Sequence, residues 1–196
     1  MRNQKLVARL GRRTILFIMT VAPLGLNTAA NSQGTGTHHP PKTDAEMIAN
    51  AMSAGPSAIS RDATIITMDG DKIRTLRKGS NEFTCVPDDP GSPGNDPMCL
   101  DRNAMAWLHA WMEHTEAPKG KLGLVYMLRG GSDASNDDPF ATAPSPGAQW
   151  VATGPHVMVV GMAGQLGDLP RSAANVAKPF VMWGGTSYEH VMMPVR

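Results

Sequence analysis

Two stretches of the chain repeat apolar positions with the spacing of an amphipathic helix. In residues 43–56, TDAEMIANAMSAGP, the apolar side chains fall on one face, and Thr43 or Asp44 can cap the first amides. Residues 100–114, LDRNAMAWLHAWMEH, form a similar pattern after Asp101, the expected cap. The pattern predicts two short helices that each dock through one face.

Most of the remaining chain has strand patterns. The stretch ATIITMDGDKIRTLR predicts a hairpin around Asp69-Gly70, because an Asp-Gly pair suits a tight turn. Four later stretches also read as strands, KLGLVYMLR, QWVATGPHVMVVGM, KPFVMW and YEHVMMPV, and most of them are apolar on both faces. We therefore predict an α+β fold with one disulfide, in which the two helices pack on a mostly antiparallel sheet of about five or six strands, covered on both faces.

The start of the chain has the pattern of a secretory signal. Basic residues precede an apolar run at 14–26, which is shorter than the roughly 20 residues of a membrane span. We expect residues 1–30 to be cleaved, 31–42 to form a flexible lead-in and 43–196 to form a single globular domain. The protein is then periplasmic or extracellular, without a stable membrane span once the signal is removed.

Removal of the signal changes the charge balance. The chain has 18 Lys and Arg residues against 17 Asp and Glu, and five of the basic residues lie in the signal, which leaves 13. No basic patch follows, which argues against nucleic acid as a partner. Arg12-Arg13 resembles a degenerate twin-arginine signal, so both that route and the general secretory route stay open.

The two cysteines, Cys85 and Cys99, enclose a loop rich in Asp, Pro and Gly. In an exported protein two lone cysteines most often pair. A catalytic thiol at Cys99, with His109 or His114 as base, would have to survive an oxidising compartment. The loop could also bind calcium, but Asp-Pro turns explain its composition. We predict a disulfide that ties a strand end to the start of the second helix.

Familiar catalytic motifs are missing from the sequence, which contains no GxSxG, GxxxxGK, HExxH or CxxC. Candidate chemistry is confined to two regions. In the polar stretch SDASNDDP, Asp133, Asp137 and Asp138 offer carboxylates for a ligand or for calcium, although an EF-hand would need a Gly and a Glu that are replaced here.

The second region is a near-repeat, PHVMVV and EHVMMPV, in which His, Val and Met recur in the same order. On a strand, alternate side chains share a face, so His156 lies with Met158 and His190 with Met192. If the strands are neighbours, two imidazoles and two thioethers converge near the loop of Asp133, a donor set that suits copper. The alternative is a methionine-rich core with structural histidines.

The segments FTCVPD, GNDPMCLD, SDASNDDPFAT, TGPHVM and EHVMMPV resemble those of a family of small exported bacterial proteins of unknown function. The resemblance implies export and a single domain from about residue 44 onward. It implies no catalytic residue and no substrate.

Three functions stay open on the sequence. Our first expectation is an exported, non-catalytic module that binds a small molecule or a metal. The second is a hydrolase-like enzyme that uses His156 or His190 with Asp137 or Asp138. The third is a structural protein of the cell envelope. A pocket lined by both histidines would favour the first two, whereas burial with bonds to the backbone would favour the third. The oligomeric state is not indicated.

We predict that the exported protein begins near Asn31, because small residues at Thr28 and Ala30 suit a signal peptidase. N-terminal sequencing of exported protein should show this start. Exported wild-type protein that begins at Met1 would contradict the prediction.

Overall fold

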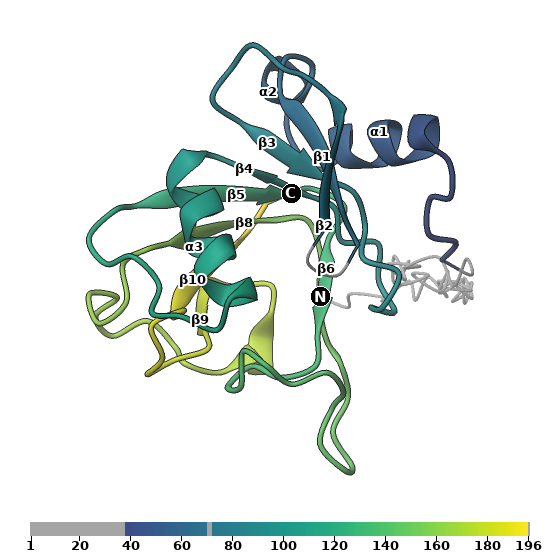
Figure 1. Cartoon of the computed structure of the whole chain (residues 1–196). Coiled ribbons are helices and arrows are strands. Elements are labelled where there is room, and N and C mark those ends of the chain that lie inside the picture. The colour runs from purple at the N-terminus through teal and green to yellow at the C-terminus, as the bar shows by residue number, and fades with distance from the viewer. Residues whose placement is uncertain (1–37, 70–71, 196) are drawn as a thin grey trace, which may run out of the picture. The chain divides into compact units, whose positions relative to one another are not determined.

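The computed structural model describes residues 38–69 and 72–195, so the expected signal and most of the lead-in lie outside the described residues. Both predicted helices are present and start at their predicted caps (Figure 1). Thr43 and Glu46 form a capping box, and the Asp101 carboxylate accepts a hydrogen bond from the Ala104 amide at 2.8 Å.

None of the helices in the described ranges is long and apolar enough to cross a membrane. The helices are α1 (Asp44–Met52), the short α2 (Ser57–Ser60) and α3 (Arg102–Met112), with a 3-10 turn η1 (Ala173–Asn175).

Within residues 38–69 and 72–195, eight strands form one sheet in the order β2-β1-β3-β4-β5-β8-β10-β9, in which only the β1–β3 pair is parallel. The α+β fold with a mostly antiparallel sheet is therefore confirmed. The sheet exceeds the expected strand number because β3 and β4 have three residues each, too few for alternation to reveal. A separate ribbon pairs β6 with β7. The strands are β1 (Thr64–Asp69), β2 (Lys72–Arg77), β3 (Thr84–Val86), β4 (Met98–Leu100), β5 (Gly123–Met127), β6 (Gly131–Asp133), β7 (Val151–Thr153), β8 (His156–Val160), β9 (Phe180–Met182) and β10 (His190–Pro194).

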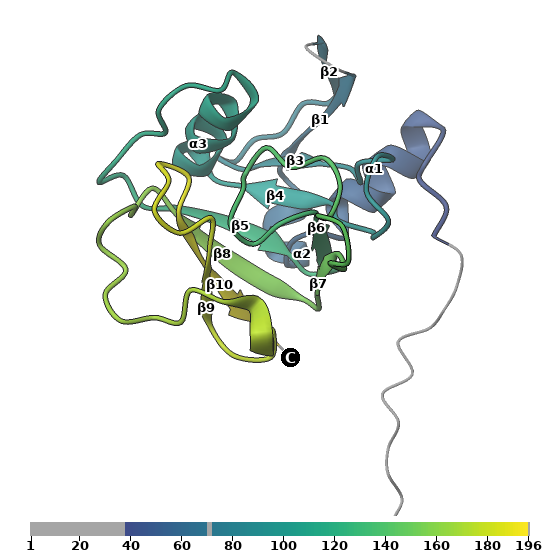
Figure 2. The same ribbon diagram turned by 90° about the horizontal axis from the view of Figure 1, so that it is seen from below.

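The helices pack on opposite faces of the sheet (Figure 2). Helix α3 covers the larger core, and α1 packs on β1 and β3 around a smaller core. Alternation along the strands divides the side chains, since Cys85 lies in the smaller core and Val86 in the larger one. On β8 the second face is less covered than we expected, because Val157 and Val159 are only half-buried there.

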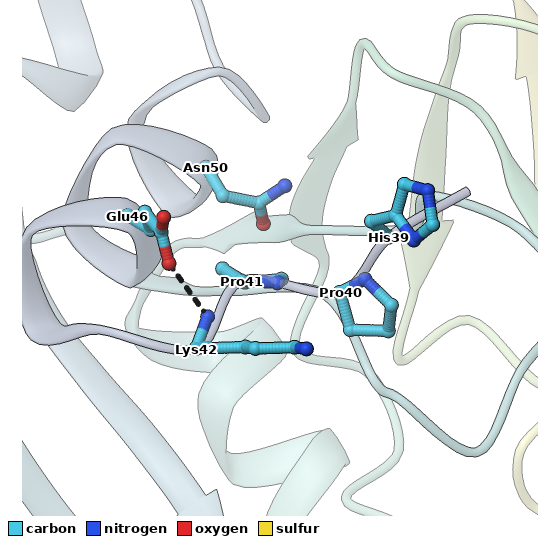
Figure 3. Close-up of a pocket in the computed structure, with 6 residues that line it drawn as sticks. All are labelled: His39, Pro40, Pro41, Lys42, Glu46 and Asn50. Carbon is cyan, nitrogen blue, oxygen red and sulfur yellow. Dashed lines mark hydrogen bonds between the residues drawn. The ribbon is translucent and has the colours of Figure 1, made fainter. Parts of the chain in front are cut away.

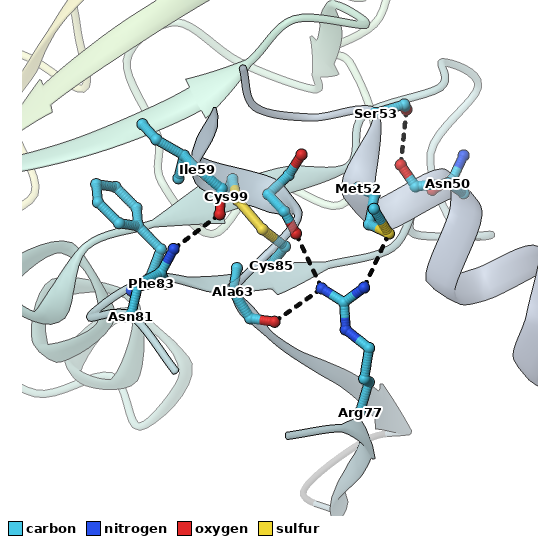
Figure 4. The surroundings of a disulfide bond; sticks show 11 residues. Asn50, Met52, Ser53, Ile59, Ala63, Arg77, Asn81, Phe83, Cys85 and Cys99 are labelled. Atoms are coloured by element: carbon cyan, nitrogen blue, oxygen red, sulfur yellow. Dashed lines mark hydrogen bonds between the residues drawn. A yellow bond between two sulfur atoms is a disulfide. The ribbon is translucent and has the colours of Figure 1, made fainter. Parts of the chain in front are cut away.

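Cys85 and Cys99 form the predicted disulfide and lie directly opposite one another in the β3–β4 pair. The bridge joins two neighbouring strands rather than the sheet and a helix, because the chain forms β4 before α3 begins. Gly55 lets the turn after α1 approach the bridge, since a Cβ there would lie 3.2 Å from the Cβ of Cys99. Nearby, the Arg77 guanidinium donates to the Ala63 carbonyl at 2.9 Å (Figure 4). The disulfide is the centre of the smaller core.

We predict that replacing both cysteines with serine lowers the free energy of unfolding by about 3 kcal/mol, because the bridge closes a loop of about 15 residues. The far-UV circular dichroism spectrum should stay that of the wild type. Urea denaturation measures the difference, with reduced wild-type protein as the matched control that should behave like the variant. Equal stability of the variant and the oxidised wild type would contradict a stabilising role for the bridge.

Candidate functional site

The two His-Val-Met strands, β8 and β10, are antiparallel neighbours and run side by side in both ribbon views (Figures 1 and 2). Met158 and Met192 lie directly opposite each other in this register. Cross-strand partners and residues two apart project from the same face of a sheet. His156 and His190 therefore share a face with the methionine pair, and all four side chains are buried in the core that α3 covers.

The near-repeat in the sequence becomes a local two-fold arrangement in the sheet. A rotation that exchanges Met158 with Met192 also exchanges His156 with His190, because the strands are antiparallel. Each imidazole makes the same local contact. The Nδ1 atoms of His156 and His190 lie 2.8 Å and 2.9 Å from the carbonyl oxygen two residues earlier in the chain.

Burial and the bonds to backbone carbonyls favour the neutral form of both imidazoles, with the proton on Nδ1. A carbonyl oxygen only accepts, so the ring nitrogen that faces it must donate. Burial lowers the pKa of His156, and it lowers the pKa of His190 to about 4. Each Nε2 is therefore an unprotonated acceptor. Both Nε2 atoms are buried, and neither has a hydrogen-bond partner among the described residues.

Tryptophan side chains enclose the His190 ring. Its centroid lies 5.3 Å from that of Trp107 and 5.0 Å from that of Trp183, in edge-to-face contacts. Trp183 has a left-handed backbone, with φ at 54°, and its ring stacks on Trp107 at 5.9 Å. The Trp183 indole donates to the Ser135 carbonyl at 3.1 Å. The polar loop 131–147 therefore docks beside His190 through Trp183.

The carboxylates of this loop take other partners. Asp137 and Asp138 are exposed, and both of their amides donate to the Ser135 hydroxyl, so they build local turns. Asp133 ends β6 in a half-buried position, where burial and the nearby Asp96 raise its pKa to about 7. Within the described ranges, no hydrogen bond or ion pair links these carboxylates to either buried imidazole.

Asp133 belongs to a cluster of acids around the disulfide loop. The buried carboxylate of Asp88 accepts a hydrogen bond from the Asp96 amide at 2.9 Å. It also lies 2.6 Å from the His38 Nε2, and this contact holds the described end of the lead-in against the domain. Burial raises the pKa of Asp96 to about 6, and Asp88 adds to this effect. In the part of the chain that the structure describes, no three His, Cys, Asp or Glu side chains are placed to hold a metal ion.

His156 and His190 share a face but not a position along it. His156 pairs with Pro194, four residues beyond His190, so the Cα atoms of the two histidines are offset by about 13 Å along the strands. This offset favours a separate position for each imidazole, although the charge of His156 still contributes to the lowered pKa of His190. The register favours separate positions over the single shared ion that we expected from the sequence.

Two surface pockets are described, and neither buried imidazole lines them. The first has a volume of about 390 Å³ and is lined by His39, Pro40, Pro41, Lys42, Glu46 and Asn50 (Figure 3). The second, of about 300 Å³, is lined by the loops that follow α3, β8 and β9. Burial and backbone bonding of both imidazoles are the features expected of structural histidines, and the unpartnered Nε2 atoms depart from that expectation.

Neighbouring strands add two methionines that the sequence analysis did not select. Met127 on β5 pairs directly with His156, and Met182 on β9 pairs directly with His190. Both methionines are buried in the same core. Alternation places each of them on the inner side of a strand, but alternation does not show which strands are neighbours.

No family model, curated protein or solved structure matches the chain. The resemblance to small exported bacterial proteins therefore stays a prediction. Function has to be inferred from the side chains of the site.

We predict that Asp133→Asn makes the protein more stable than the wild type at about pH 8 and leaves it nearly unchanged at about pH 4. The folded state raises the pKa of Asp133 to about 7. The contribution of Asp133 to the free energy of unfolding is therefore fully present below about pH 4 and is lost as the pH rises to about 7. The limiting slope is about 1.4 kcal/mol per pH unit.

Denaturation curves recorded across this pH range measure the effect. Asp137→Asn, at an exposed position of the same loop, is the matched control and should follow the wild type. An Asp133→Asn curve parallel to that of the wild type would show that Asp133 is not buried as an acid.

Proposed function

We propose that the protein is an exported, non-catalytic module that binds copper(I) on the face formed by β8 and β10. The observation that carries the proposal is the pair of buried imidazoles of His156 and His190. Each Nδ1 is bonded to a backbone carbonyl, and each Nε2 is an acceptor without a partner among the described residues. Metal-bound histidines commonly have this arrangement, because the bond from the second nitrogen fixes the tautomer and the ring.

A purely structural role accounts for one nitrogen of each imidazole and not for the other. A buried acceptor that lacks a partner costs about 1–3 kcal/mol, and the same core holds two of them. A metal ion bound at Nε2 would replace the missing partner without any change at Nδ1. The paired Nε2 atoms therefore favour a ligand-binding role over a structural role for this face.

The donors around the imidazoles favour a soft, singly charged ion. Met158 and Met192 place two thioethers between the imidazoles, and thioether with imidazole suits copper(I). All of these donors are neutral, so the charge of a bound ion is not compensated, and a monovalent ion costs less to bury than a divalent one. Calcium needs six to eight oxygen ligands, which this methionine-rich face does not supply.

The hydrolase alternative has weaker support. Its acids, Asp137 and Asp138, are exposed and bonded within their own loop, whereas both imidazoles are buried. A general acid or base must lie within hydrogen-bond reach of the group that it serves. The envelope-associated structural role is the stronger competitor, and it differs from our proposal in requiring no metal.

Export is part of the proposal and has separate support. The disulfide between Cys85 and Cys99 suits an oxidising compartment, in which such bonds persist. The basic and apolar start of the sequence lies outside the described residues and supports export by its pattern alone.

We predict that the folded protein, freed of its signal, retains copper(I) against a chromophoric copper(I) chelator under anaerobic conditions. Met158→Leu combined with Met192→Leu should weaken binding by at least about tenfold, or about 1.4 kcal/mol. Leucine keeps the volume of methionine and removes the donor sulfur, so each substitution should cost less than about 1.5 kcal/mol of stability. The readouts are chelator absorbance and the melting temperature with and without copper(I).

Met98→Leu is the matched control, because Met98 packs against the same core from β4 and is outside the proposed donor set. Its copper(I) affinity should equal that of the wild type. If the wild type gives up all copper(I) to the chelator, or the double variant binds as tightly as the wild type, the proposal is wrong and the structural role is favoured.

A further inference from the structure

We infer that this face holds two separate copper(I) sites, each made of one imidazole and two thioethers; the inference rests on the proposed function. The first site consists of Met127, His156 and Met158, from β5 and β8. The second consists of Met182, His190 and Met192, from β9 and β10.

In the first site, three donors from two strands gather at one position. Met127 lies directly opposite His156 in the β5–β8 pair, and Met158 follows His156 by two residues on the same face. Gly131 lies against the side chains of both Met127 and His156. A Cβ on Gly131 would lie 3.1 Å from the Met127 methyl carbon and 3.4 Å from the His156 Cε1, the atom beside Nε2.

The second site repeats this arrangement on the other side of the methionine pair. Met182 lies directly opposite His190 in the β9–β10 pair, and Met192 follows His190 by two residues. All three side chains are at most 1 % exposed. The Trp107 and Trp183 rings border the imidazole and make an apolar surround. Such a surround excludes water from a bound ion.

The same local two-fold rotation relates the two sets. It exchanges β8 with β10, and it carries the outer strand β5 onto the outer strand β9. Met127 and Met182, each opposite an imidazole, therefore occupy equivalent positions. Nothing in the chemistry of a hydrophobic core requires the sulfur-bearing residue at both positions, whereas two equivalent metal sites require it.

The offset between the imidazoles separates the sites. The Cα atoms of His156 and His190 are offset by about 13 Å along the strands, which favours separate ions over one shared ion. Each imidazole does have two thioethers in adjacent positions. One imidazole and two thioethers form a neutral, soft, three-coordinate donor set that suits copper(I).

The test counts copper(I) ions in the folded protein by anaerobic titration against the chromophoric chelator. The wild type should bind two ions per chain. Met127→Leu should remove or weaken one of them by at least about tenfold, and Met182→Leu should do the same to the other, about 1.4 kcal/mol in each case. The combined variant should lose both ions. Met98→Leu should keep both, and circular dichroism should show each variant to be folded.

A variant that keeps every donor tests the first site separately. Gly131→Ala places a methyl group against Met127 and His156, so it should weaken the first site and leave the second unchanged. His156→Gln should add little to the effect of Met127→Leu, since both act on one site. It should add fully to the effect of Met182→Leu, since those two act on different sites.

The outcomes separate this inference from the proposed function. One bound ion that survives Met127→Leu and Met182→Leu, and is lost with Met158→Leu and Met192→Leu, overturns the two-site inference and leaves the proposed function standing. Two bound ions that neither Met127→Leu nor Met182→Leu affects overturn the assigned donors. No ion retained by the wild type overturns both.

Discussion

The direct pairing of Met158 with Met192 is the constraint on which the rest of the candidate site depends. A register shift of one residue between β8 and β10 would turn one set of side chains toward the opposite face of the sheet. The observed register instead carries both thioethers and both imidazoles into the core that α3 covers, while Val157 and Val159 take the half-buried face. Burial of one face therefore fixes the strand register and the position of every proposed donor.

The two ends of the sheet differ in what stabilises them and in the side chains that they bury. At one end the disulfide fixes β3 against β4, with small side chains from α1 packed around it. At the other end, β5, β8, β10 and β9 carry a core rich in methionine and aromatic residues. Strand β5 connects the two ends, since it pairs with β4 on one side and β8 on the other. The disulfide can stabilise the sheet without contributing a group to the candidate site.

Local signals in the sequence identified the helices, the hairpin strands and the disulfide. Thr43 and Asp101 mark helix starts because capping is a local hydrogen bond. The three-residue strand β4 escaped prediction because alternation needs more residues to be visible, and β3 was predicted only as the strand end at Cys85. The His-Val-Met repeat identified four of the six proposed donors. Met127 and Met182 were missed, because their role depends on which strands pair, and that is a property of the whole fold.

The central claim is that two buried imidazoles present unprotonated Nε2 atoms to a soft metal. Nitrogen NMR of the histidine side chains in the folded, metal-free protein at neutral pH tests it most directly. Our account predicts protonated Nδ1 and unprotonated Nε2 for both His156 and His190, and added copper(I) should shift both Nε2 resonances while Nδ1 stays protonated. A proton on either Nε2, or Nε2 resonances that copper(I) leaves unmoved, would contradict it.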